Sequence, residues 1–247
     1  MAKEEAAAPT VTSEAIFVQS TIYAHESRDV ATCDIPGAFL QADNPDFVLM
    51  RLDGILAELM VKIAPTIEGK QMTICWHVDD LFIGHNNSNV VTTFLEWLAQ
   101  WYDTNEKKLN VVRGHKHDYL GMNLDFSTKG AVCIDMIPYI KKINDAFPEQ
   151  ITGVQSTPAG DRLFQVCPPD EATYLPEEQA RAFHHTTAQL LFLSRVRHDI
   201  QTTVAFLTTR VKKPDNDDWG KLKRVLKYLH TAHSLCLTLS ADSLSNI

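Results

Sequence analysis

The strongest constraint on the fold is a pair of adjacent aspartates, Asp79 and Asp80, inside a strand-like apolar run. The residues before the pair, Gln71 to Val78, and after it, Leu81 to Ile83, are rich in β-branched and aromatic side chains. Two such runs separated by a short polar break are typical of a β-hairpin. The sequence therefore predicts a hairpin with two carboxylates at its tip.

Strands and helices are expected along most of the chain. The expected strands, bounded by Pro, Gly and polar turns, are Asp29–Ile35, Phe47–Leu52, Tyr119–Phe126 and Val132–Met136. The expected helices are residues 12–27, Leu56–Ile63, Val90–Tyr102, Tyr139–Phe147, Ala180–Arg210 and Trp219–Thr231. The side chains of Val90–Tyr102 expected to face inward are Val90, Val91, Phe94, Leu95, Leu98 and Trp101. This order predicts an α+β fold, with helices on one face of an antiparallel sheet and then a mostly helical region.

The composition indicates the class of protein and its expected location in the cell. The 247 residues are 45% hydrophobic, which suits an ordinary globular core. The sequence has no apolar run of the roughly 20 residues that span a bilayer, and Met1–Pro9 reads as a disordered leader without a signal peptide. We therefore expect no membrane association and a cytoplasmic location, with a virus-like particle or the nucleus as alternatives. The sequence leaves the oligomeric state open.

Charge and motifs exclude several classes of function. The net charge of −8 argues against a protein that coats nucleic acid indiscriminately, although basic residues outnumber acidic ones between Arg195 and His230. No GxxxxGK, HExxH or GxSxG motif is present, so common NTPase, zinc-protease and esterase classes lack support.

The acidic residues favour a site for divalent metal. Asp34 lies at the end of an expected strand, and clustered carboxylates repel one another unless a cation neutralises them. Two ions about 4 Å apart can activate a hydroxyl and stabilise a leaving pyrophosphate. Asp34 and Asp79 are the expected ligands. The same arrangement would also serve a metal-dependent nuclease, and an isolated Asp-Asp pair more often only favours a turn.

Two motifs carry a resemblance to a known family. The run DIPGAFL, from Asp34 to Leu40, resembles the first catalytic motif of copia-type (Pseudoviridae) retrotransposon reverse transcriptases. The run HVDD, from His77 to Asp80, resembles their Tyr-Val-Asp-Asp motif. The run from Tyr119 to Met122 is similar to their primer-grip turn, and Phe183 to Thr231 is similar to the helical stretch that precedes RNase H.

The resemblance implies a polymerase palm over residues 10–136 and a thumb- or connection-like region over 137–247. It implies an RNA-directed DNA polymerase that uses Mg²⁺ or Mn²⁺ to add deoxynucleoside triphosphates (dNTPs) to a DNA primer on an RNA template. The implied catalytic residues are Asp34, Asp79 and Asp80, and the implied metal ligands are Asp34, Asp79 and the backbone carbonyl of Ile35. The implied dNTP-binding residues are Gly37, Ala38 and Phe39. The implied primer grip is Leu120, Gly121 and Met122.

Phe39 and the basic helical region add two details. An aromatic ring at Phe39 would clash with a ribose 2′-hydroxyl and so favour deoxynucleotides, although ordinary core packing is the alternative. Arg195, Arg197, Lys221 and Arg224 are candidate contacts to nucleic acid, and a solvated helix face is the equally supported alternative.

The chain also departs from the family pattern. His77 replaces the usual tyrosine, a change that keeps a hydrogen-bonding aromatic ring. The interval between Pro65 and Lys70 is short where family members carry a Lys-Lys-Ala-Leu-Tyr-Gly-like stretch. By the same comparison with the family pattern, we expect the fingers and the RNase H domain to be missing. Because phosphoryl transfer depends on positioning and charge stabilisation, a catalytically silent retroelement remnant that at most binds nucleic acid is the alternative function.

Overall fold

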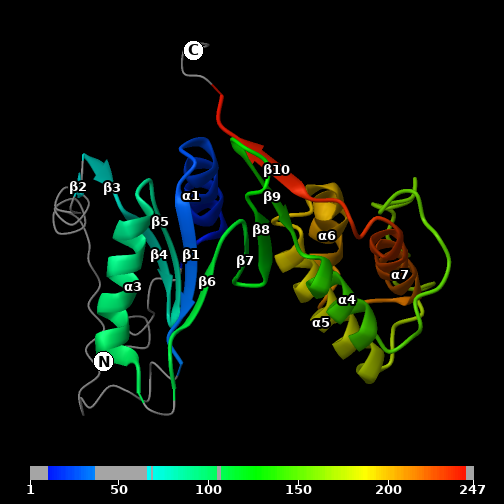
Figure 1. The fold of residues 1–247 in the computed structure, drawn as a ribbon. Coiled ribbons are helices and arrows are strands. Elements are labelled where there is room, and N and C mark those ends of the chain that lie inside the picture. Colours follow the sequence, from blue (N-terminus) through cyan, green and yellow to red (C-terminus); the bar gives the residue numbers. More distant parts are fainter. Residues whose placement is uncertain (1–10, 37–65, 68, 105–106, 243–247) are drawn as a thin grey trace, which may run out of the picture. The chain divides into compact units, whose positions relative to one another are not determined.

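The computed structural model describes residues 11–36, 66–67, 69–104 and 107–242 (Figure 1). One compact unit ends at Cys133 and resumes at Thr238, and the second runs from Ile134 to Leu237. Across the described residues the fold is α+β, as predicted, with six α-helices and two four-stranded sheets. The expected leader Met1–Pro9, strand Phe47–Leu52 and helix Leu56–Ile63 lie outside the described residues. The predicted functional division at residue 136 stays a prediction.

The first sheet of the first unit is antiparallel and has the strand order β4-β5-β1-β6. Its strands are β1 (Asp29–Asp34), β4 (Thr73–His77), β5 (Asp80–His85) and β6 (Asn110–Arg113). The central strands β1 and β5 are buried along most of their length, which fits their apolar sequences. The predicted hairpin is therefore confirmed, and β6 is a strand that the sequence did not predict. The short strands β2 (Thr66–Ile67) and β3 (Lys70–Gln71) form a separate pair.

Helices cover both faces of this sheet, which corrects the prediction of helices on one face (Figure 1). The helix α3 (Ser88–Tyr102) packs on the face that carries Cys33, Leu81 and Ile83. Because side chains alternate along a strand, Phe82 lies on the opposite face, where its ring centroid is 4.9 Å from that of Tyr23 in α1 (Ser13–His25). The α1 helix begins at its predicted cap, since the side chain of Thr12 accepts a hydrogen bond from the Ala15 amide.

The buried face of α3 is narrower than predicted. Val91, Leu95 and Leu98 are buried at the helical spacing i, i+4, i+7, and Phe94 packs at the edge of the same cluster. Trp101, predicted to face inward, is 70% exposed. The buried stripe continues from Leu98 to Tyr102, which packs against the same cluster, so Trp101 lies beside the stripe and points away from the core.

The second sheet has the order β10-β9-β8-β7, with strands β7 (Lys116–Tyr119), β8 (Met122–Asp125), β9 (Ala131–Asp135) and β10 (Leu237–Ser240). The predicted continuous strand Tyr119–Phe126 is wrong, because the chain turns back at Leu120 and Gly121. Both residues have positive φ, 51° and 76°, as a two-residue type I′ hairpin turn requires. The strand β10 was not predicted.

The second unit contains the helices α4 (Ile137–Ala146), α5 (Glu177–Leu193), α6 (Gln201–Thr208) and α7 (Asn216–Thr231) and the 3₁₀ turn η2 (His198–Ile200). The predicted single helix Ala180–Arg210 is broken after Ser194. The α7 helix begins before the predicted Trp219, because Asp215 and Asp218 form a reciprocal capping box. In the described part of the chain, no helix is long and apolar enough to cross a bilayer.

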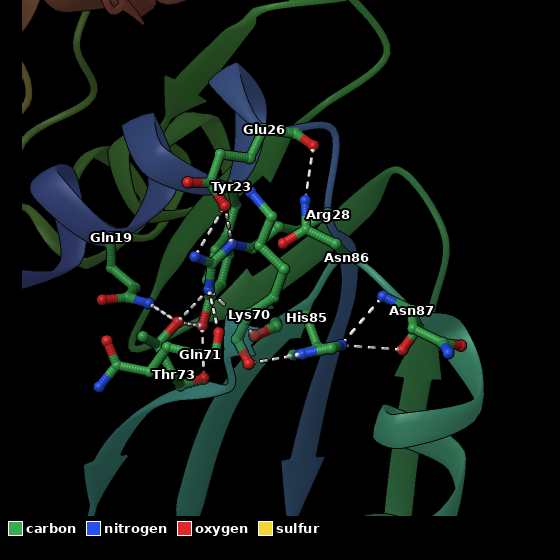
Figure 2. Close-up of polar contacts among 11 residues, drawn as sticks. Gln19, Tyr23, Glu26, Arg28, Lys70, Gln71, Thr73, His85, Asn86 and Asn87 are labelled. Carbon is green, nitrogen blue, oxygen red and sulfur yellow. Dashed lines mark hydrogen bonds and ion pairs between the residues drawn. The ribbon is translucent and has the colours of Figure 1, made fainter. Parts of the chain in front are cut away.

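Arg28 anchors the start of β4 to the end of α1 (Figure 2). Its side chain is only 6% exposed and donates hydrogen bonds to Glu26, to the Gln71 carbonyl and to the Thr73 hydroxyl. His85 is buried beside this network and contacts the Lys70 carbonyl and the Asn87 amide through its two ring nitrogens. These contacts attach residues 70–73, at the end of the short interval between Pro65 and Lys70, to the first sheet.

Candidate active site

The predicted catalytic carboxylates meet at one end of the first sheet. Asp34 is the last residue of β1, Asp80 is the first residue of β5, and the antiparallel register pairs them directly. Directly opposed residues share a face, with Cα atoms about 4.5–5.5 Å apart. His77 pairs with Asp80 and Asn110 pairs with Asp34, so these four residues form a row across the sheet on the face of Phe82.

Asp79 lies beside this row, in the two-residue turn that joins β4 to β5. Val78, the other turn residue, has φ of 56°, a conformation that β-branched residues rarely adopt. Two hydrogen bonds hold the turn: the Ile35 amide donates to the Asp79 carbonyl (3.0 Å), and the indole N–H of Trp76 donates to the Val78 carbonyl (2.8 Å). The main chain of Asp79 is therefore tied to the residue that follows Asp34.

The electrostatic field at the row is negative. Burial, followed by the carboxylates of Asp79 and Asp34, raises the pKa of Asp80, and the nearby His77 opposes the rise. Burial and the surrounding carboxylates, Asp34 first, raise the pKa of the Cys33 thiol to about 11. Cys33 therefore stays protonated at neutral pH. The carboxylates destabilise one another, and a cation would relieve that repulsion.

The donor set fits Mg²⁺ that is only partly held by protein. Mg²⁺ commonly binds one or two carboxylates and completes its shell with water and substrate phosphates. The paired Asp34 and Asp80 and the adjacent Asp79 offer such oxygens. Among the described residues, no group of three or more His, Cys, Asp or Glu side chains is arranged so that it could hold a metal ion. The paired carboxylates would therefore supply at most part of the coordination shell of such an ion.

Asp80→Asn is expected to stabilise the protein in the absence of divalent metal. A raised pKa means that the folded state holds the Asp80 proton more tightly than the unfolded chain, so ionised Asp80 destabilises the fold above its folded pKa. We expect the melting temperature at pH 7 to rise by about 1–3 °C, and the difference to vanish as the pH falls toward about 4. Calorimetry of both proteins from pH 4 to 8 in EDTA measures this difference.

Asp125→Asn is the control, and its expected effect on the melting temperature has the opposite sign. Hydrogen bonds from Ser127 lower the pKa of Asp125, so loss of its charge is expected to lower the melting temperature at pH 7. A lower melting temperature for Asp80→Asn at pH 7 would contradict the mutual repulsion inferred for the row.

The other predicted polymerase residues fall into two groups. Gly37, Ala38 and Phe39, expected to contact the incoming nucleotide, lie outside the described residues. Ile35 is 1% exposed and its side chain belongs to the α3 core cluster, so only its main chain is available to a ligand. Its carbonyl as a metal ligand stays a prediction.

The turn expected to hold the primer is connected to the aspartate hairpin through Tyr119. The buried Tyr119 hydroxyl donates to the Cys75 carbonyl of β4 (3.1 Å), and its ring stacks on Phe82 at 5.2 Å between centroids. Leu120 is partly buried and Gly121 is exposed at the turn, whereas Met122 is 2% exposed and packs in the core. Leu120 and Gly121 are therefore the members of the predicted grip that a ligand can reach.

The sequence analysis placed Tyr119 in the run similar to the primer-grip turn without naming it as a site residue, and it did not single out Trp76, although both support the site. Asp118, on β7, also contributes to the raised pKa of Asp80 and was not singled out. The available signal was the position of Asp118 and Tyr119 immediately before the Leu120–Gly121 turn.

The four basic residues that were predicted to contact nucleic acid differ in their exposure. Arg197 is a correction: it is 2% exposed and donates to both oxygens of Asp199 (2.9 and 2.7 Å), so its charge is neutralised and inaccessible to phosphate. Arg195 is exposed and lies over the Phe192 ring. Lys221 and Arg224, both on α7, line one cavity of the second unit.

Comparison with known proteins gives one similarity. No protein-family model matches the chain, and no solved structure matches it. The chain is 24% identical over 173 residues to a transposon Ty5-1 protein of Saccharomyces cerevisiae, an alignment that covers 69% of this chain and 52% of the yeast protein. The chain thus spans about half the length of that curated relative. This weak similarity indicates a retrotransposon origin.

Proposed function

We propose that the chain is part of a retrotransposon reverse transcriptase of the copia type, with the first unit as the polymerase palm and the helical second unit as a thumb- or connection-like region. The observation that carries the proposal is the direct pairing of Asp34 with Asp80 at the end of two central strands, with Asp79 in the adjoining turn. The DIPGAFL and HVDD motifs and the similarity to the transposon protein support it.

Each group in the site has a distinct part in the proposed reaction, which adds dNTPs to a DNA primer on an RNA template. Asp34, Asp79 and the Ile35 carbonyl would hold Mg²⁺ or Mn²⁺, which when bound would promote attack by the primer 3′-hydroxyl and departure of pyrophosphate. Asp80 adds negative charge beside them and so strengthens cation binding.

The remaining groups position the substrates. Gly37, Ala38 and Phe39 would contact the nucleotide sugar, with the Phe39 ring selecting against a 2′-hydroxyl. The Leu120–Gly121 turn would hold the primer end. The Tyr119 hydroxyl donates a hydrogen bond to the Cys75 carbonyl of β4, and this contact would help to hold the primer end in place relative to the aspartate hairpin.

Primer extension tests the proposal directly. The whole chain, incubated with poly(rA)/oligo(dT), dTTP and Mg²⁺ or Mn²⁺, is expected to lengthen the primer, and EDTA is expected to abolish the reaction. Primer shortening in place of lengthening would identify a metal-dependent nuclease that uses the same carboxylates. Absence of both from a folded protein would reject the enzymatic proposal and leave a catalytically silent remnant.

A further inference from the structure

An exposed apolar surface lies along the β4 edge of the first sheet, wholly within the first unit. Trp76 of β4 pairs with Leu81 of β5, and Ile74 lies two residues earlier on the same side of the strand. Leu81 belongs to the core cluster beneath α3, so both β4 side chains lie on the α3 face of the sheet. Trp76 is 57% exposed and Ile74 is 37% exposed, since α3 packs over the central strands β5 and β1. Neighbouring exposed apolar side chains of this size are typical of a surface that another segment covers.

The flank of α3 that faces β4 is also apolar. Arg113 of β6 donates a hydrogen bond to the Thr92 hydroxyl (3.2 Å), so Thr92 lies on the flank that faces β6. At about 100° per residue, Trp97 and Trp101 lie on the other side of the buried stripe, toward β4. They are 50% and 70% exposed, and the Trp97 ring stacks on Phe94 (5.8 Å between centroids). We name four exposed side chains the α3–β4 surface: Ile74, Trp76, Trp97 and Trp101.

The chain between β1 and β4 has to cross the sheet. Both strands pair antiparallel with β5, so they are parallel to one another. The chain leaves β1 at the end that carries the aspartates, and it returns at the opposite end, where Arg28 binds the Gln71 carbonyl before β4 begins. Parallel strands need a connection of about a dozen residues or more, usually one that contains a helix packed on the sheet. Residues 37–65, which lie outside the described residues, are long enough and include the expected helix Leu56–Ile63.

The handedness of such connections selects the face. The connection β5–α3–β6 also joins two parallel strands, and α3 lies on the face of Leu81. The connection from β1 to β4 starts in the opposite direction and steps the opposite way across the sheet. Because nearly all such connections are right-handed, and two reversals leave the hand unchanged, both are expected on the same face. The opposite face already carries Tyr23 and Tyr119, whose rings pack on Phe82.

We propose that residues 37–65 pack on the α3–β4 surface, with the expected helix Leu56–Ile63 as the part that covers it. This stretch has apolar residues at the helical spacing i, i+3, i+4, i+7, namely Leu56, Leu59, Met60 and Ile63. Contact between two apolar surfaces removes both from water, which is favourable. The packing follows from the sheet order and from the exposed side chains, and it holds whether or not the chain is a polymerase.

Photo-cross-linking from α3 tests the proposal in the whole chain. Trp97→p-benzoylphenylalanine places a photoreactive aromatic ring on the α3–β4 surface. Glu96→p-benzoylphenylalanine is the matched control, because Glu96 is exposed one turn after Thr92, on the flank that faces β6. The ketone reacts with C–H bonds in van der Waals contact, so we expect roughly tenfold more cross-linking to residues 37–65 from position 97 than from position 96. Mass spectrometry of the digested monomer measures both yields.

A second pair of variants tests whether apolar contact holds the segment. In the chain with the photoreactive residue at position 97, Leu59→Asp is expected to reduce the cross-linking by roughly fivefold or more, because a buried carboxylate is costly. Glu58→Gln, in the same stretch, is expected to change it less than about twofold, since no apolar side chain is altered. If a melting curve shows that Leu59→Asp unfolds the chain, the comparison of positions 96 and 97 decides alone.

Three outcomes would overturn the proposal. Equal yields from positions 96 and 97 would show that the segment does not prefer the β4 side of α3. Cross-links that join two chains would show that a second copy covers the surface. No cross-link from position 97 to any residue would show that the surface faces water. All yields are measured without nucleotide or primer, so failure of the polymerase proposal would leave them unchanged.

Discussion

Asp79→Asn is expected to lower the rate of primer extension by about 10³-fold or more while the fold stays intact. The substitution removes a charged oxygen at the point where a divalent cation and a triphosphate would meet, and lost transition-state stabilisation of this kind costs several kcal/mol. The turn itself should survive, because the Asp79 contact with Ile35 is made by the main-chain carbonyl. Single-nucleotide incorporation with saturating dTTP and Mg²⁺, together with a melting curve, measures both effects.

Asp118→Asn is the matched control for this experiment. Asp118 is exposed on β7 and adds to the negative field at Asp80, yet it is not a proposed ligand. We expect less than about a threefold change in rate, since only a distant charge is lost. Asp34→Asn is expected to lower the rate of primer extension by as much as Asp79→Asn does. Equal losses in Asp118→Asn and Asp79→Asn would show that overall negative charge, and not metal ligation by particular carboxylates, drives the reaction.

The parts of the fold that were predictable are those with a strong local pattern. The hairpin at Asp79, the capped helix at Thr12 and the strand at Asp29 each carry their own signal, and the structure confirms them. The strands β6 and β10 have little local sequence signal, because β6 is exposed along its whole length and β10 is only half-buried. Such strands are defined by pairing with a distant partner, which periodicity does not reveal.

The candidate site likewise contains residues that could be predicted from the sequence and residues that could not. The aspartates could be named from the sequence because a charged pair within an apolar run is conspicuous, and the family resemblance gave them roles. The support of Tyr119 and Trp76 depends on hydrogen bonds to main-chain carbonyls, one of them 44 residues away in the sequence. Arg197 was misassigned because sequence gives its charge and not its burial against Asp199. The partner of Tyr119 is distant in the sequence, whereas those of Trp76 and Arg197 are two residues away. The folded geometry and the burial of the side chains, and not residue types, decided these cases.

Arg28→Met is expected to be the most destabilising of the substitutions considered, by roughly 3 kcal/mol, which corresponds to a fall in melting temperature of about 6–12 °C. Methionine keeps much of the apolar stem but none of the donors. The loss leaves the Gln71 carbonyl and the Thr73 hydroxyl without the guanidinium, and leaves Glu26 without its ion pair, in a region where Arg28 is 6% exposed. Acceptors that are left unsatisfied on burial carry most of the expected loss.

Arg113→Met is the control in the same unit. Arg113 pairs with Asp29 across the edge of the first sheet, but the two side chains are 32% and 27% exposed, so water replaces the lost contact. We expect Arg113→Met to lower the free energy of unfolding by less than about 1 kcal/mol. Urea unfolding monitored by tryptophan fluorescence gives both values. Because Arg28 fixes the residues that lead into β4, its loss should also reduce primer extension at temperatures where the variant is still folded. Equal and small effects of the two substitutions would show that β4 and the hairpin at Asp79 are positioned by the sheet alone.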